Sequence, residues 1–169
     1  MKKITCNSIG VIHSPFKDTK GMPIQSSAAH GIKATIDLNP AYAAGLKDLA
    51  GFSHIIVLYH FHRSKGYSLK VRPFLDNNRH GVFATRAPQR PNPIGISVVK
   101  LLNLTGNVLE IENVDILDGT PLLEIKPYVP AFDVKWAKRI GWLTKIVDRV
   151  YVTKADERFK AKKPGKAIK

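Results

Sequence analysis

Apolar and polar residues alternate over short runs along most of the chain, and glycines and prolines separate the runs. Residues 32–38 alternate with a period of two, which is typical of a half-buried strand, and residues 9–13 and 122–126 are further strand candidates. Residues 54–61 form a continuous apolar run of the length of a buried strand. Residues 96–104 and 108–112 flank Thr105-Gly106-Asn107 and predict a β-hairpin, whose Gly-Asn pair suits the positive φ of such a turn.

Helical signals are fewer. Pro40 suits a first helical turn and begins a predicted helix through Leu49, which Gly51 ends; residues 132–139 are a second short candidate. The chain has no internal repeat and no regular alternation of strands and helices. This pattern favours a mainly β fold, an antiparallel barrel or sandwich with a few short helices. We assign residues 1–150 to this domain and residues 151–169 to a basic, flexible tail.

Length and composition narrow the class of protein. The 169 residues suffice for one domain with a core of its own. Cys6 is the single cysteine, which excludes a disulfide framework and fits a reducing compartment. The sequence contains no secretory signal and no apolar run long enough for a membrane span, so we expect a soluble, cytoplasmic protein without a membrane partner.

The chain carries a formal charge of +14, which points to a polyanionic partner. Between His54 and Lys100 eight basic residues face one acidic residue, Asp76, and four of the six histidines lie in the same window. Residues 154–169 hold a further net +5. A lysine-rich end is usually disordered, so we expect this tail to lie outside any active site and at most to contact phosphates.

The segment Thr85-Arg86-Ala87-Pro88-Gln89-Arg90-Pro91-Asn92-Pro93-Ile94-Gly95 is the most unusual part of the sequence. Its prolines fix φ and force the residues before them into extended conformations, which makes the segment rigid and keeps it out of a regular helix. Arg86 and Arg90 therefore project from a preset backbone. A stiff connector between strands explains the prolines but gives no reason for the arginines or Asn92.

A second segment, Asp115 to Tyr128, places carboxylates on both sides of an Asp-Gly-Thr turn. Such a carboxylate can hold ribose hydroxyls or a cationic ligand. A Rossmann fingerprint, a Walker loop and a Gly-x-Ser-x-Gly elbow are all absent. His60 and His62 lie two residues apart without an acidic or cysteine neighbour, so we expect no metal site.

These two segments, together with Gly51-Phe52-Ser53-His54, His62-Arg63 and the opening Ile9-Gly10-Val11-Ile12-His13-Ser14-Pro15-Phe16, resemble the TsaA/TrmO family over residues 7–143. The resemblance implies a TsaA/YaeB-like β-barrel methyltransferase, with S-adenosyl-L-methionine bound near a homodimer interface and tRNA as the substrate. Family members methylate N6 of threonylcarbamoyladenosine beside the anticodon. The sequence departs from the family pattern at Ala87 (usually Ser), Ile96 (usually Leu) and Glu124 (usually Asp), and bacterial members carry a further C-terminal domain.

Carried over position by position, the resemblance assigns cofactor binding to eleven residues: Pro23, Ile24, Gln25, His62, Arg63, Arg86, Ile96, Asp118, Gly119, Thr120 and Pro121. We expect the anticodon arm to contact the basic residues of the 54–100 window, and we name Arg90, Lys126 and Tyr128 as substrate-binding candidates.

Asn92 is the catalytic candidate, because an amide oxygen can orient an exocyclic amine and accept its N–H groups during methyl transfer. Its side chain could equally cap a turn. Two other functions stay open: an RNA-binding barrel without enzymatic activity, and a methyltransferase with a different RNA or a small-molecule acceptor. The first would need exposed aromatic residues among the basic ones, and the second has no use for the charge of the 54–100 window.

Overall fold

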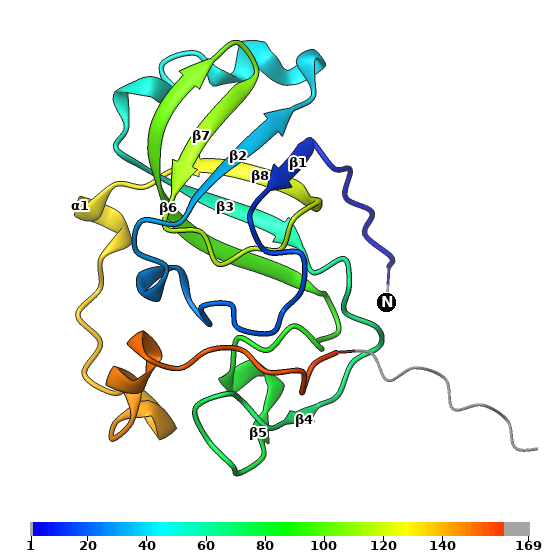
Figure 1. Ribbon diagram of the computed structural model, residues 1–169, viewed down its shortest axis with the longest axis vertical. Coiled ribbons are helices and arrows are strands. Elements are labelled where there is room, and N and C mark those ends of the chain that lie inside the picture. Colours follow the sequence, from blue (N-terminus) through cyan, green and yellow to red (C-terminus); the bar gives the residue numbers. More distant parts are fainter. Residues whose placement is uncertain (1, 161–169) are drawn as a thin grey trace, which may run out of the picture.

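The computed structural model describes residues 2–160, and six of its strands close into an antiparallel barrel (Figure 1). The order around the barrel is β1-β2-β7-β6-β3-β8. The bounds are β1 Gly10–His13, β2 Lys33–Leu38, β3 His54–His60, β6 Ile94–Thr105, β7 Val108–Glu112 and β8 Thr120–Pro127. The predicted β-barrel is thus confirmed.

The barrel core consists of the inward-facing residues, which occupy every second position along the strands. In β3 the buried positions are Ile55, Val57 and Tyr59, and the other five barrel strands add Ile12, Ile36, Val99, Leu109, Ile111 and Leu122. The predicted β6–β7 hairpin forms as expected, with Gly106 at a φ of +61° in its turn. Each strand candidate of the sequence coincides with a barrel strand within a few residues at either end.

The predicted helix from Pro40 forms as two 3₁₀ segments, η2 Pro40–Leu46 and η3 Leu49–Gly51. Asn39 caps the first by accepting a hydrogen bond from the Ala41 amide. Asp48, at a φ of +65°, interrupts the run. The second predicted helix, 132–139, is wrong. A single turn, α1 Pro130–Asp133, stands there, and the residues after it are irregular because Phe132 and Trp136 are exposed and pack no apolar face against the barrel.

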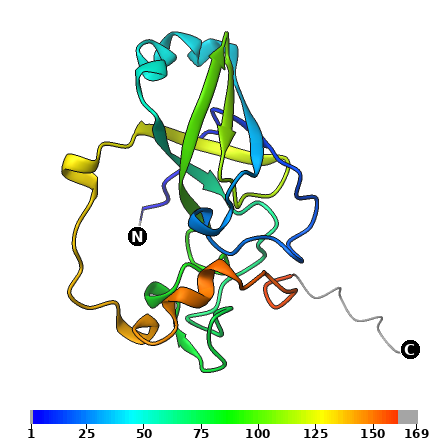
Figure 2. The ribbon, with the colours of Figure 1, turned by 60° about the vertical axis from the view of Figure 1, so that its left-hand side comes forward.

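A small region lies at one end of the barrel and contains the two-stranded sheet of β4 Lys70–Val71 and β5 His80–Gly81 with η4 Val82–Ala84 (Figure 1). Its own cluster consists of Val71, Val82 and Ala87. After β8 the chain passes through α1 and returns to this region through η5 Gly141–Leu143 and η6 Val147–Tyr151, standing away from the barrel on the way (Figure 2). There Trp142 stacks on His80 at 4.4 Å between ring centroids. A remaining 3₁₀ turn, η1 Ser26–Ala28, follows the first long loop.

Residues 153–160 then run back along this loop. Lys154 forms an antiparallel bridge with Pro23, in which the Gly21 amide donates to the Ala155 carbonyl at 2.8 Å and the Ala155 amide donates to the Met22 carbonyl at 2.8 Å. Phe159 packs against the cluster of the small region and meets Phe74 edge-on. The predicted boundary at residue 150 stays a prediction, and residues 161–169 of the predicted tail lie outside the described residues.

No helix in the described part of the chain is long and apolar enough to cross a membrane. Residues 2–160 also contain no cluster of three or more His, Cys, Asp or Glu side chains that could hold a metal ion.

Candidate cofactor site

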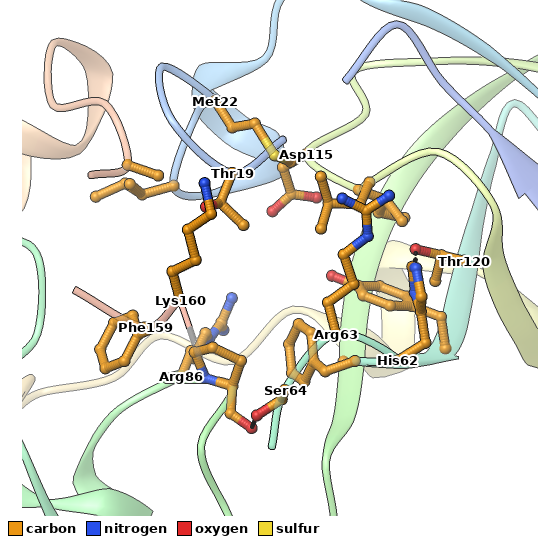
Figure 3. A pocket seen from close by; sticks show the side chains of 18 of the residues that line it. Thr19, Met22, His62, Arg63, Ser64, Arg86, Asp115, Thr120, Phe159 and Lys160 are labelled. Atoms are coloured by element: carbon orange, nitrogen blue, oxygen red, sulfur yellow. Dashed lines mark hydrogen bonds between the residues drawn. The ribbon is translucent and has the colours of Figure 1, made fainter. Parts of the chain in front are cut away.

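The site lies where β3 ends and β6 and β8 begin, since these antiparallel neighbours meet at one end of the barrel. A cavity of about 480 Å³ opens there between the barrel and the small region. That volume falls within the range of roughly 300–1,000 Å³ that is usual for small-molecule sites. Its walls come from the 18–25 loop, the end of β3, the proline segment, the β7–β8 connection and residues 155–160 (Figure 3).

Eight of the eleven predicted cofactor residues line this cavity: Pro23, Ile24, Gln25, His62, Arg63, Arg86, Ile96 and Thr120. They come from five separate stretches of the chain. Arg86 donates from Nη1 to Gln25 Oε1 at 2.6 Å, which joins the proline segment to the first loop. Arg63 donates from Nη1 to the Lys17 carbonyl at 2.8 Å.

His62 and Thr120 form a polar contact inside the cavity, with His62 Nδ1 at 3.3 Å from Thr120 Oγ1. Burial lowers the pKa of His62 from its usual 6.5, and the charges of Arg63 and His60 lower it further. The ring is therefore neutral at neutral pH, so it can accept as well as donate a hydrogen bond.

The other three predicted residues of the Asp118 turn do not line the cavity. The Asp118 carboxylate accepts hydrogen bonds from Lys17 Nζ at 2.6 Å and from the Ser14 amide at 3.1 Å, and these contacts hold its pKa below the usual range. Gly119 occupies the turn with a φ of +72°, and Pro121 pairs with Val11 in the barrel. In this structure the turn sets the position of Thr120, and the Asp118 carboxylate fixes the 14–17 segment.

The proline segment is rigid for reasons that the sequence only partly indicates. Arg90 lines the cavity, but its Nη2 also donates to the carbonyls of Val82 and Thr85, each at 3.3 Å, so it holds the fold of the segment. The Phe61 amide donates to the Pro93 carbonyl at 2.8 Å and ties the segment to the end of β3. Asn92 is exposed, does not line the cavity and precedes Ile94, which does.

Lys126 and Tyr128 lie at the other end of β3 from the cavity. Lys126 pairs with Ile56, and Tyr128 meets the ring of His54 edge-on. Since a strand rises about 3.3 Å per residue, the length of β3 separates them from His62. The structure does not bring these two substrate candidates to the site.

The sequence reasoning also misses residues of the site. Ala155, Asp156, Phe159 and Lys160 line the cavity, although the sequence predicts that the basic tail stays away from it. An aromatic residue within a lysine-rich end, Phe159, is the one signal that could have indicated docking. Lys160 donates to Asp18 at 2.8 Å, which lowers the pKa of Asp18 to about 2 and helps to raise that of Lys160 to about 12.

The second missed group is a polar network on the cavity floor. Ser97 donates to Asp115 Oδ1 at 2.7 Å, and Tyr59 Oη lies 3.2 Å from Ser97 Oγ. Burial raises the pKa of Asp115 and of Tyr59, so the Tyr59 phenol is neutral. Asp115 is one of the carboxylates of the segment that could hold ribose hydroxyls or a cationic ligand, but the sequence does not show that it, rather than Asp118, faces the cavity.

A comparison with protein families matches residues 11–134 to the model described as the tRNA-methyltransferase O N-terminal domain. A probable S-adenosyl-L-methionine-binding protein of Pyrococcus abyssi is 59% identical over 151 residues, which cover 89% of this chain and 82% of that protein. The tRNA (adenine(37)-N6)-methyltransferase of Escherichia coli is 37% identical over 77% of this chain and 60% of its own length. The crystal structure of TrmO from Pseudomonas aeruginosa superimposes with a TM-score of 0.71 at 36% identity, over 83% of this chain and 63% of that one. The chain thus spans somewhat less than two thirds of the last two proteins.

Proposed function

The chain belongs to the family of the tRNA-methyltransferase O N-terminal domain, and on this basis we propose that it binds S-adenosyl-L-methionine in the cavity and methylates N6 of an adenosine next to the tRNA anticodon. The finer substrate of the proposal is threonylcarbamoyladenosine. Relatives named as S-adenosyl-L-methionine-binding proteins and as tRNA (adenine(37)-N6)-methyltransferases support it.

One observation carries the proposal: eight of the eleven cofactor residues that the family resemblance names lie far apart in the sequence and yet line one cavity of suitable size. Apolar side chains such as Met22, Phe61 and Ile116 line the same space and suit an adenosyl group. Arg63 and Arg86 provide hydrogen-bond donors for a carboxylate, and Gln25 and Thr120 provide neutral polar groups. The residues present therefore fit an amphipathic, zwitterionic ligand.

S-adenosyl-L-methionine supplies an electrophilic methyl group, so the protein's main task is to align the acceptor nitrogen with it. Arg86 is fixed by Gln25 and by its place between a buried threonine and Ala87, so its guanidinium is preset before a ligand arrives. His62 is held neutral and therefore does not repel a cationic donor.

Basic side chains around the cavity suit the phosphates of an anticodon arm. Arg63 and Lys65 are exposed at its rim, and Arg72 and Arg79 are exposed on the small region beside it. Each phosphate contact releases counterions, so tRNA binding should weaken steeply with salt.

Asn92 stays our candidate for the group that accepts the N–H of the reacting amine. It is exposed next to the cavity and its backbone is held, because its carbonyl accepts from the Ile94 amide at 2.8 Å. If it acts on the acceptor, Asn92→Ala keeps its affinity for S-adenosyl-L-methionine and loses methylation. Unchanged turnover would leave Asn92 a turn residue.

We further propose that a second copy of the chain covers the outer face of β6, where Ile94, Ile96 and Val98 are exposed to 41%, 53% and 36%. Ile94 and Ile96 also border the cavity, so a partner seated there would lie beside the cofactor. Val98→Glu, which lies outside the cavity lining, should turn a dimer into a monomer in size-exclusion chromatography with light scattering. A wild-type protein that is monomeric at micromolar concentration would exclude this assembly. The cytoplasmic location stays a prediction.

The deciding experiment incubates the protein with methyl-labelled S-adenosyl-L-methionine and tRNA, followed by mass spectrometry of the nucleosides. We expect label in N6-methylated adenosine derivatives from tRNA that carries threonylcarbamoyladenosine, and none from tRNA that lacks it. Arg86→Gln should abolish the label, while Lys47→Gln, which changes an exposed lysine after η2 and outside the cavity, should retain it.

Calorimetry with S-adenosyl-L-methionine alone provides a second arm. Binding of the methyl donor without label in any nucleoside would indicate another acceptor. Binding of tRNA without any binding of the donor would indicate a non-enzymatic RNA-binding barrel instead.

A further inference from the structure

Asp115 contributes to the cavity a carboxylate that has no role in the proposed function. It lies in the β7–β8 connection between Val114 and Ile116, which are exposed to 0% and 1% and fix the backbone in the barrel core. The Ile116 carbonyl accepts a hydrogen bond from Ser14 Oγ at 2.6 Å, which anchors the connection further. From this rigid backbone the Asp115 side chain points into the cavity (Figure 3).

The surroundings of Asp115 hold its carboxylate in one orientation. Ser97 donates to Oδ1, and Ser97 is itself in contact with the Tyr59 hydroxyl. Ser97 and Tyr59 are buried side chains of β6 and β3, with exposures of 4% and 5%. The network therefore joins three barrel segments and leaves the rest of the carboxylate facing the cavity.

Asp115 differs from the other carboxylates of the cavity in its partners. Asp18 forms an ion pair with Lys160 at 2.8 Å, and Asp156 forms one with Arg158 at 2.7 Å. Asp115 forms no ion pair with any basic side chain of residues 2–160. Arg86 is near enough for its charge to favour the ionised form, but burial outweighs this and raises the Asp115 pKa. Asp115 is thus a partly buried carboxyl without a basic partner among residues 2–160, and a cation bound in the cavity would favour its ionised form.

The chemistry of the neighbours indicates which cation fits. An ammonium group needs several hydrogen-bond acceptors, whereas a sulfonium donates no N–H and is held by charge and by apolar or aromatic surfaces. Tyr59, Ile116 and Met22 line the cavity together with Asp115, and these surfaces suit an alkylated sulfur.

We propose that Asp115 lies against the sulfonium of S-adenosyl-L-methionine and makes the site prefer the methyl donor over its demethylated product. This inference rests on the proposed cofactor and deepens it. During transfer the lone pair of the acceptor nitrogen would bond to the methyl carbon while the carbon–sulfur bond breaks, and the nitrogen would then give up a proton to solvent. The product S-adenosyl-L-homocysteine carries a neutral thioether at the sulfur. The charge of Asp115 then attracts the donor and no longer attracts the product at that atom, which aids product release.

The test measures the affinities for S-adenosyl-L-methionine and S-adenosyl-L-homocysteine by calorimetry in wild type and in Asp115→Asn. The asparagine keeps the shape of the side chain and an oxygen that accepts from Ser97. Since a charged contact in a partly buried site is worth more than a neutral one, we expect the donor to bind about tenfold more weakly in the variant. The affinity for the product should stay within about twofold. In turnover, the KM for the donor should rise while kcat changes little.

Asp156→Asn is the matched control, because it removes a carboxylate of the same cavity that is already paired with Arg158. It should leave the donor-to-product ratio of affinities at the wild-type value. Asp115→Glu keeps the charge and should restore part of the preference for the donor. If Asp115→Asn does not fold, Asp115→Ser repeats the measurement.

Equal weakening of donor and product by Asp115→Asn would overturn the inference, because a merely structural role predicts that result. A wild-type protein that binds neither ligand would instead overturn the proposed cofactor itself. The two failures are therefore distinguishable.

Discussion

Gly95 of β6 lies directly opposite Tyr59 of β3 in the barrel register, and the tyrosine ring occupies the space above the glycine. A Cβ atom at this position would lie 2.2 Å from Tyr59 Cε2 and 2.4 Å from Cζ. Unstrained carbon contacts are about 3.5–4.0 Å long, so Gly95→Ala forces the ring to move by more than 1 Å on that scale. The ring borders the cavity, but a shift of this size would break its edge-on contact with Phe61 and move its hydroxyl away from Ser97.

Overpacking of a barrel or core costs typically about 1–3 kcal/mol, and the size of the clash together with the Phe61 and Ser97 contacts that Tyr59 would lose places Gly95→Ala at the upper end. For a chain of this size each kcal/mol lowers the melting temperature by about 2–4 °C, so thermal unfolding followed by circular dichroism should show a fall of about 6–12 °C. The affinity for S-adenosyl-L-methionine should fall as well, since the ring supports Ser97 and Asp115.

Two comparisons separate a steric clash from a general cost of losing glycine. Gly81→Ala is the matched control, because a Cβ atom added at Gly81 would have no neighbouring atom within 4 Å and the Gly81 φ of −58° suits alanine. The second comparison places Gly95→Ala in a Tyr59→Leu background, where the ring is gone and the alanine should cost little. The steric clash would be refuted if Gly95→Ala had the same melting temperature as the Gly81→Ala control. It would also be refuted if Gly95→Ala lowered the melting temperature as much in the Tyr59→Leu background as in wild type.

Three further predictions follow from the site and its walls. Burial raises the pKa of Asp115 above its usual 3.8, so the wild-type protein loses stability as the pH rises from 3.8 through the pKa of the folded state. The melting temperature of Asp115→Asn should therefore exceed that of wild type by more at pH 7 than at pH 3.5. An equal difference in melting temperature at the two pH values would contradict this. Burial lowers the pKa of His62, so an NMR titration should place the midpoint of this histidine below 6.5. The stability that the neutral ring contributes should be lost as the pH falls through that midpoint. A midpoint at or above 6.5 would show that the ring is not desolvated. Phe159→Ala removes a half-buried ring that contacts Phe74 and the small region. We expect the free energy of unfolding in urea to fall by about 1–2 kcal/mol and proteolysis between residues 153 and 160 to become faster. Phe83→Ala should show neither effect, because the Phe83 ring is 78% exposed.

The barrel could be predicted because its signal is local. A strand with one buried face shows an alternating pattern in the sequence, as residues 32–38 do, and the β6–β7 turn carries its glycine at the position of positive φ. The helix predicted at 132–139 fails for the opposite reason. Propensity alone does not hold a short helix, and the exposed Trp136 has no surface to pack on.

The residues of the candidate cofactor site could be predicted only as far as a family pattern reaches. His62 and Thr120 come together because β3 and β8 are neighbours in the barrel. The two residues lie more than fifty positions apart in the sequence, and periodicity does not reveal that their strands pair. Asp118 shows the limit of such a pattern. Its carboxylate lies outside the cavity and fixes Lys17 and Ser14, so a matching position does not establish a matching contact. The docking of Phe159 depends on a receptor surface built by distant residues and has no local signature.

The bridge between Pro23 and Lys154 has a consequence for the order in which the protein is made. A ribosome releases the first loop of the candidate site before β2, whereas residues 153–160, which hold this loop, emerge only after β8. Barrel closure through β1 and β8 can occur before then, since β8 ends at Pro127. The barrel should therefore form during synthesis while the cofactor loop still lacks its partner, and a nascent chain should gain affinity for its ligand only once residues 153–160 have left the exit tunnel.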